Sequence, residues 1–239
     1  MADAISIVKT SMLADMERLT TYGQNFANSG TAGYKRQIPL NLDFIRLMDS
    51  NFNRTYGSSG LTFSSTDLAA GAIKSTGRSL DVAIEGDGFI AVNSSAGQRY
   101  MRRGDLSLDG RGRLVAPSGD PVAGTGGDIH LQNDQVSIAA DGTITANGQT
   151  LGQLQLVRFD NPDKLVYEGN GLFNAEGANL SDRHDTVSVR QGFLEMSNVQ
   201  AAQDMLGLMS TSRHFDLIHN AATAYDQMLD AAINDLSAS

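Results

Sequence analysis

The chain has 239 residues, a formal net charge of −9 and no cysteine. A chain of this length can form one sizeable domain or two small ones. The lack of cysteine excludes disulfides, thiolate metal sites and cysteine nucleophiles. The acidic balance argues against a nucleic-acid partner, and no apolar run reaches the roughly 18 residues of a membrane-spanning helix, so no membrane insertion is expected.

Residues 3–27 predict a long helix. An apolar seam runs along it at the alternating three- and four-residue spacing of a coiled coil, broken only by Asp15. Asn28-Ser29-Gly30 then supplies a stop, because Asn and Gly tolerate the left-handed conformation of a helix C-cap. The seam either contacts other subunits or packs on the chain's own domain, and periodicity does not separate the two. The seam residues are Ile5, Val8, Met12, Leu19, Tyr22 and Phe26.

The N-terminal segment does not read as a secretory signal. Asp3, Asp15 and Glu17 interrupt it, and its apolar residues are spaced rather than contiguous. If the protein leaves the cytoplasm, we expect a route without cleavage, so that the N-terminus is retained.

Residues 37–75 are mixed in character and predict a linker or extended arm. The apolar positions between Leu40 and Leu47 suit a strand or a short helix, whereas residues 51–65 are rich in Asn, Ser, Gly and Thr, as in a loop.

Residues 76–190 predict an antiparallel β domain. Leu80, Val82 and Ile84 alternate with other residues, and Asp109-Gly110, Asp141-Gly142 and Asn147-Gly148 fall between short apolar stretches. These dipeptides accept the positive φ of tight hairpin turns. The strands do not alternate with helices as in a nucleotide-binding α/β sheet. We expect this segment to fold alone.

Residues 193–236 predict a second long helix with its own seam. The phase of the seam shifts between Thr211 and Phe215, which indicates a stutter or a break between two helices. The seam residues are Val199, Leu206, Met209, Ile218, Tyr225, Leu229 and Leu236. The expected fold is therefore mixed and mainly β: a central antiparallel β domain flanked by N- and C-terminal α-helices that form a coiled-coil-like core on assembly.

Signals of catalysis are weak. His214 and His219 lie five apart and do not share a helix face as a metal-binding pair would. Pairs of carboxylates are present, such as Asp105 with Asp109, but surface or turn roles suit them better than acid–base catalysis. We therefore predict no catalytic, cofactor-binding or metal-binding residues. A cluster of arginines suits either a contact with an acidic face of a neighbouring subunit or a solvated strand; its members are Arg99, Arg102, Arg103, Arg111 and Arg113.

Four blocks, in order along nearly the whole chain, resemble the bacterial flagellar basal-body rod family. The N-terminal block, residues 25–35, reads NFANSGTAGYK and is similar to the family signature, with Phe26 in place of the usual Leu. Its signature residues are Asn25, Asn28, Gly33, Tyr34 and Lys35. The other blocks are residues 80–89 (LDVAIEGDGF), residues 100–115 and residues 192–199 (GFLEMSNV). Within the family the chain looks most like a proximal rod protein.

The resemblance implies a structural, non-enzymatic subunit of the rod that transmits motor torque across the periplasm. Its partners would be other rod proteins and copies of itself, and during secretion the flagellar type III export apparatus. It implies four segments: a rod-core helix (1–36), an arm (37–75), the β domain (76–190) and a second rod-core helix (191–239). Alternatives are a distal rod or hook subunit, a rod-associated cell-wall glycan hydrolase, and an adhesin or secreted filament unrelated to motility.

Overall fold

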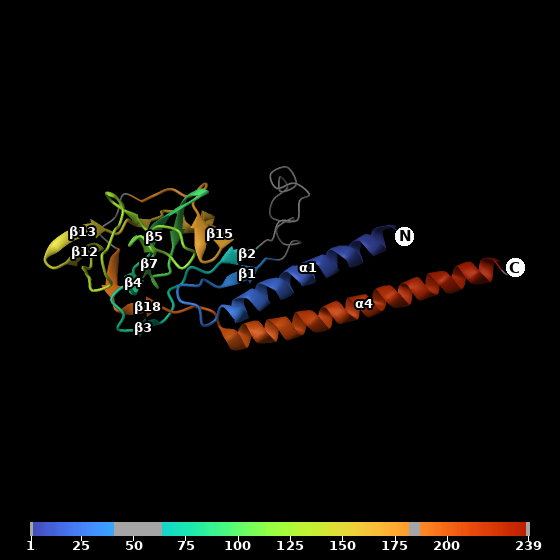
Figure 1. Cartoon of the computed structure of the whole chain (residues 1–239). Coiled ribbons are helices and arrows are strands. Elements are labelled where there is room, and N and C mark those ends of the chain that lie inside the picture. The colour runs from blue at the N-terminus through green and yellow to red at the C-terminus, as the bar shows by residue number, and fades with distance from the viewer. Residues whose placement is uncertain (1, 41–63, 182–186, 238–239) are drawn as a thin grey trace. The chain divides into compact units, whose positions relative to one another are not determined.

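The computed structural model describes residues 2–40, 64–181 and 187–237. These residues are mainly β, with one long helix at each end, α1 (Ala2–Ala27) and α4 (Ala201–Ser237) (Figure 1). The predicted combination of a β body and two terminal helices is confirmed. The expected coiled-coil core on assembly stays a prediction.

The chain forms two compact units. One, which we call the helical unit, contains α1, α4 and the segment that begins with β1 (Gln37–Pro39). The other, which we call the β unit, consists of Asn28–Arg36 and Thr66–Val199. The predicted division at residues 36, 75 and 190 stays a proposal.

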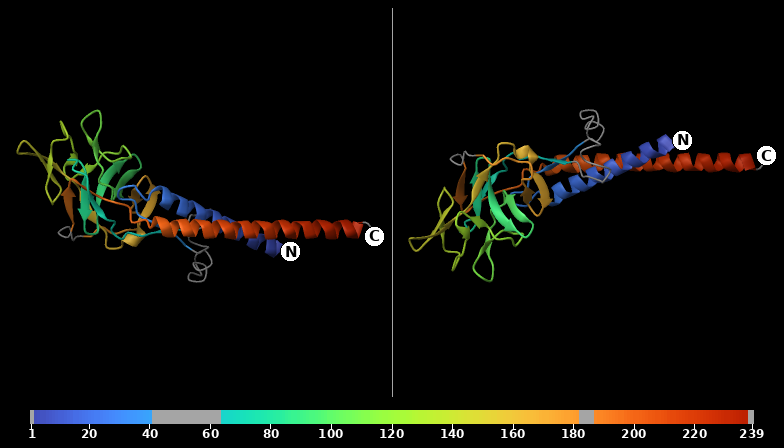
Figure 2. Two further views of the ribbon diagram at one scale, coloured as in Figure 1. Left: turned by 90° about the horizontal axis from the view of Figure 1, so that it is seen from below. Right: turned by 90° about the horizontal axis from the view of Figure 1, so that it is seen from above.

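In the helical unit α1 and α4 run alongside one another in opposite directions (Figure 2). Helix α4 is amphipathic, because its less exposed positions recur at three- and four-residue steps, as pairing with another helix requires. Strand β1 packs against α1 and pairs with β2 (Ser64–Thr66).

The β unit is built on a five-stranded antiparallel sheet in the order β14-β5-β6-β16-β15. Strand β5 is buried on both faces, because Ile90 and Val92 enter one core cluster while Phe89 and Ala91 enter the other. The second cluster is aromatic: Phe89 contacts Phe159 and Phe173 edge-on, with centroids 5.7 and 5.8 Å apart. The strands are β5 (Gly88–Ser94), β6 (Gly97–Met101), β14 (Leu156–Arg158), β15 (Val166–Gly169) and β16 (Leu172–Asn174).

Smaller antiparallel ladders complete the β unit. β3 (Ile73–Ser75) pairs with β18 (Phe193–Glu195), and β4 (Val82–Glu85) pairs with β17 (Ser188–Gln191). The remaining elements are β7 (Ser107–Leu108), β8 (Leu114–Val115), β9 (Ala123–Gly124), β10 (Gly127–Asp128), β11 (Ser137–Ile138), β12 (Thr143–Ala146), β13 (Gln149–Gln153) and the 3₁₀ turn η1 (Pro162–Lys164).

All three predicted turns join antiparallel strands. Asp109-Gly110 lies between β7 and β8, Asp141-Gly142 between β11 and β12, and Asn147-Gly148 between β12 and β13. Asn147 and Gly148 have φ of 52° and 77°, the positive pair that a two-residue primed turn needs.

One predicted boundary is wrong. The helix expected from residue 193 begins at Ala201, and Phe193–Glu195 is strand β18 instead. The apolar spacing of residues 193–199 was compatible with a helix, but pairing with β3 overrides that local preference. The strand or helix expected between Leu40 and Leu47 and most of the loop expected over 51–65 lie outside the described residues.

Candidate functional site

The contact between α1 and α4 contains two close pairs, one heptad apart on each helix. Asp15 Oδ2 lies 2.6 Å from His214 Nδ1, within hydrogen-bond distance. The Asp15 side chain is 1% exposed, and Arg18 also reaches its carboxylate, at 3.3 Å. The ring of Tyr22 lies directly over Gly207, where a Cβ would stand 2.7 Å from its Cζ.

The predicted seam of α1 lies partly on this contact face. Val8, Met12, Leu19 and Tyr22 are half-buried, whereas Phe26 is 48% exposed. Asp15, which the sequence marked as a break in the seam, is among its most buried residues. The side chain of Ile5 lies outside the described part of the chain. The role of these residues in contacts between subunits stays a prediction.

Helix α4 is continuous through the predicted phase shift at Thr211–Phe215. Its less exposed face follows one regular spacing through that region: Asp204, Leu208, Thr211, Phe215, Ile218, Ala222 and Tyr225. Leu206 and Met209 are 68% and 46% exposed and lie off this face. The predicted seam therefore combined residues from two different faces of the helix, and this combination produced the apparent phase shift.

Leu206 belongs to an outer apolar stripe of α4. Leu206, Leu217 and Met228 recur every eleven residues, which returns them to one side of the helix, opposite the face that contains Phe215. They are 68%, 67% and 66% exposed. Val199 is half-buried and precedes the helix, and the side chains of Leu229 and Leu236 are not among those described.

Each signature residue has a distinct structural task. In the helical unit the Asn25 side chain, fully buried, pairs with the backbone of Gln37: its amide donates to the Gln37 carbonyl at 2.7 Å and its oxygen accepts the Gln37 N–H at 2.9 Å. In the β unit Asn28 closes a turn by accepting from both the backbone N–H and the hydroxyl of Thr31.

Gly33 and Tyr34 fix the signature loop to the sheet of the β unit. Gly33 has φ of +64°, and a Cβ there would stand 2.6 Å from the backbone nitrogen of Arg103, so both conformation and space require glycine. Tyr34 is buried and packs edge-on against Tyr167 of β15, with ring centroids 6.0 Å apart. The loop is thereby held at a defined place on the β unit.

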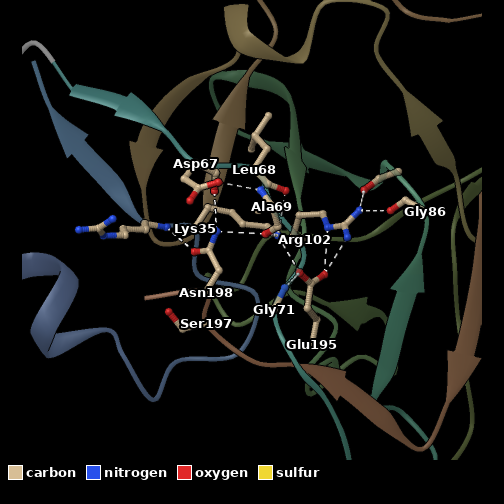
Figure 3. Close-up of polar contacts among 12 residues, drawn as sticks. Lys35, Asp67, Leu68, Ala69, Gly71, Gly86, Arg102, Glu195, Ser197 and Asn198 are labelled. Carbon is tan, nitrogen blue, oxygen red and sulfur yellow. Dashed lines mark hydrogen bonds and ion pairs between the residues drawn. The ribbon is translucent and has the colours of Figure 1, made fainter. Parts of the chain in front are cut away.

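Lys35 ends in a buried charge network that joins both ends of the β unit (Figure 3). Its Nζ donates to Glu195 Oε1 at 2.6 Å and to the carbonyl of Ala69 at 2.7 Å. Arg102 approaches the other carboxylate oxygen at 2.8 Å. The side chains of Lys35, Glu195 and Arg102 are 1%, 2% and 5% exposed.

The network satisfies its own polar groups. Glu195 Oε1 also accepts the N–H of Gly71 at 2.8 Å, and Arg102 donates to the carbonyls of Gly86 and Gly88 at 2.7 and 2.6 Å. Such complete pairing is what makes a buried ion tolerable. Nearby, Asn198 accepts the Arg36 N–H at 2.7 Å and donates to the carbonyl of Asp67 at 2.8 Å.

Burial and neighbouring charges shift the pKa values of Lys35 and Glu195 in opposite directions. Burial lowers the pKa of Lys35 below its ordinary 10.5, and the Glu195 carboxylate offsets part of that change. Burial alone would raise the pKa of Glu195, but Arg102 and Lys35 outweigh it and hold the pKa below its ordinary 4.5. Glu195 is therefore ionised at neutral pH.

Sequence reasoning singled out parts of this network without joining them. Lys35 belonged to the signature, Glu195 to the block at 192–199 and Arg102 to the arginine cluster. The available signal was that Lys35 and Glu195 are the single charged residues of the blocks at 25–35 and 192–199, whereas Arg102 lies among five other charged residues and gave none. Arg102 is thus an internal ion-pair partner, and Arg99, Arg103 and Arg113 also pair within the chain, with Glu168, Asp105 and Asp109.

A catalytic site finds no support in the described residues. A cavity of about 800 Å³ is bordered by Gln153, Leu156, Ser181 and Ser188 among others. Asp141 is the one carboxylate among its described lining residues, and the Thr143 N–H and hydroxyl bind that carboxylate, whereas glycan hydrolysis needs two carboxyl groups. Among the described residues no group of three His, Asp or Glu is placed to hold a metal, and no helix there is long and apolar enough to cross a membrane.

The chain combines a β unit with a helical unit in which α1 and α4 form an antiparallel pair, an architecture that suits a structural protein. Comparison with known families makes the class specific. Residues 83–146 match the flagellar hook protein FlgE/F/G D1 domain, and residues 190–236 match the C-terminal region of flagellar basal-body rod FlgEFG proteins.

Relatives extend the match to the whole chain. The FlgF basal-body rod protein of Rhizobium meliloti is 33% identical over the full length of both chains. That of Mesorhizobium japonicum is 30% identical over 96% of this chain and 97% of its own. FlgG of Bacillus subtilis is 32% identical over 91% of this chain and 92% of its own. The chain belongs to the flagellar basal-body rod protein family, a family of structural proteins rather than enzymes, and is FlgF-like; it is a structural subunit of the basal body.

Proposed function

We propose that this protein is a proximal rod subunit that joins copies of itself and other rod proteins through its terminal helices and so transmits torque across the periplasm. The observation that carries the proposal is the outer stripe of α4. Leu206, Leu217 and Met228 are each about two-thirds exposed on the side opposite the α1 contact. Exposed apolar surface of this regularity favours burial against another helix.

The mode of export belongs to the same proposal. We infer secretion through the flagellar type III apparatus with the N-terminus retained. Support comes from the use of α1 itself in the helical unit, since removal of residues 2–27 would remove Asp15, Tyr22 and Asn25, which make the contacts described above.

Replacing Leu206 with Asp tests the outer stripe. The residue is 68% exposed, so the charge is solvated in the free subunit and its melting temperature is expected to stay unchanged. On assembly the same charge would be buried without a partner, which costs at least several kcal/mol. Cells that carry only Leu206→Asp should therefore build no complete rod and not swim, as measured by basal-body purification and motility in soft agar.

Thr223→Asp is the matched control, because Thr223 is exposed on α4 and lies to the side of the stripe. It should leave rods and swimming intact. Normal rods with Leu206→Asp, or equal loss with both variants, would contradict assembly through this stripe.

A distal rod role is the second candidate, since the Bacillus FlgG relative is 32% identical. The two roles differ in axial position. A tag on the β unit, located by electron microscopy of basal bodies, separates them: signal at the membrane-proximal end of the rod supports the first role, and signal near the hook supports the second.

A further inference from the structure

The helical hairpin contains two contacts that depend on its axial register. Asp15 meets His214 at 2.6 Å, and Tyr22 covers Gly207. Asp15 lies one heptad before Tyr22 on α1, and His214 lies one heptad after Gly207 on α4. Both contacts therefore belong to a single antiparallel alignment.

Each contact is lost on a shift by one turn. Sliding α4 in one direction would bring Ile218 opposite Asp15 and leave a carboxylate, 1% exposed, against an apolar side chain. The same shift would replace Gly207 beneath the Tyr22 ring with a residue that has a Cβ, and the ring leaves no room for that atom. The apolar positions give no such discrimination, because Phe215, Ile218, Ala222 and Tyr225 repeat along α4 at heptad spacing.

We propose that Asp15 and Tyr22 are specificity-determining residues that set the register of α1 against α4. Burial of the apolar seam stabilises the helix pair. Asp15 and Tyr22 favour one alignment over others that would bury a similar apolar area. A single polar residue within an apolar seam fixes register in this way in coiled coils, at some cost in stability. The proposal concerns pairing within one subunit and goes beyond the assembly role proposed above.

Disulfide trapping measures the register directly, because the chain has no cysteine of its own. Val8→Cys in the full-length protein is combined in turn with Ile218→Cys, Ala222→Cys or Tyr225→Cys, which sample steps of one turn on α4. One heptad beyond the Asp15–His214 pair, Val8 aligns with the turn that contains Ala222. The unmodified background is expected to form one dominant disulfide, between residues 8 and 222.

The same three pairs are then tested with Asp15→Leu and Tyr22→Leu together, which make the α1 seam uniformly apolar. The helices should still pair, as helical circular dichroism will report, but the disulfide should spread over at least two of the three pairs. A role in stability alone would change the melting temperature without changing which pair forms. Met12→Leu, an apolar exchange in the same seam, is the control and should keep the single pair.

Persistence of the single 8–222 disulfide in the double variant would overturn the proposal. So would an even spread over the three pairs in the unmodified background.

Discussion

At the scale of single residues, Glu195 is the junction on which the β unit depends. Its carboxylate accepts from Lys35, Arg102 and the Gly71 backbone, and its own carbonyl accepts the N–H of Gly33 at 2.7 Å. The partners come from three separate stretches of sequence, all distant from Glu195. Glu195 thus connects β18, in which it lies, with the signature loop, the segment before β3 and the residue that follows β6.

Replacing Glu195 with Gln should unfold the β unit at much lower denaturant. The neutral amide leaves Lys35 and Arg102 buried without a counter-charge, and breaking a buried pair in this way costs about 3–5 kcal/mol. Urea titration of the purified protein measures the loss. Glu168→Gln, which breaks the Arg99 pair on a side chain that is 38% exposed, should cost about 1 kcal/mol or less.

Lowering the pH should reproduce part of this loss of folding stability in the unmodified protein. The pKa of Glu195 is depressed in the folded state, so its contribution is complete above the ordinary pKa of 4.5 and disappears as pH falls through the lower folded value. The decline in stability between pH 4.5 and the folded pKa should therefore be shallower in Glu195→Gln. An identical pH dependence in the two proteins would show that this carboxyl does not titrate as described.

At the scale of elements, the tight turns are the part of the fold most directly encoded. Gly148 has φ of +77° and nothing lies within 4 Å of a Cβ built there, so the backbone conformation alone demands glycine. Gly148→Ala should cost about 1–2 kcal/mol in unfolding free energy. Gly126→Ala, where φ is not positive and space is equally open, should cost clearly less in the same thermal melts.

The elements also show where sequence reasoning succeeds and where it stops. Asn147-Gly148 and the long helices depend on local preferences, and these were predictable. Phe193–Glu195 looked helical because local spacing cannot reveal a distant partner strand, here β3. Asp15 looked like a defect in its seam because its partner, His214, lies at the other end of the chain. The charge network was missed for the same reason, since its contacts are long-range.

At the scale of the whole molecule, the β unit is larger than the segment that carries its turns. The fragment predicted to fold alone, residues 76–190, omits β3, β18, Lys35 and Glu195. We now expect this fragment to lack a cooperative melt, because Arg102 would lose the carboxylate that it reaches at 2.8 Å. Residues 28–199, which retain every partner, should melt cooperatively in circular dichroism. Equal melting temperatures for the two fragments would show that the network is dispensable.

The separation between Lys35 and Glu195 also sets an order in time. The two residues lie 160 positions apart, and every chain is made from its N-terminus, so Lys35 exists long before its partner. Residues 188–195 supply β17, β18 and Glu195 together, and thus close two strand pairs and the charge network in one late step. A subunit cut short before this point would keep unpaired strand edges and a buried cation without a counter-charge. Only a chain that extends through residue 195 can form these pairings, so a shorter fragment lacks both strand pairs and the charge network.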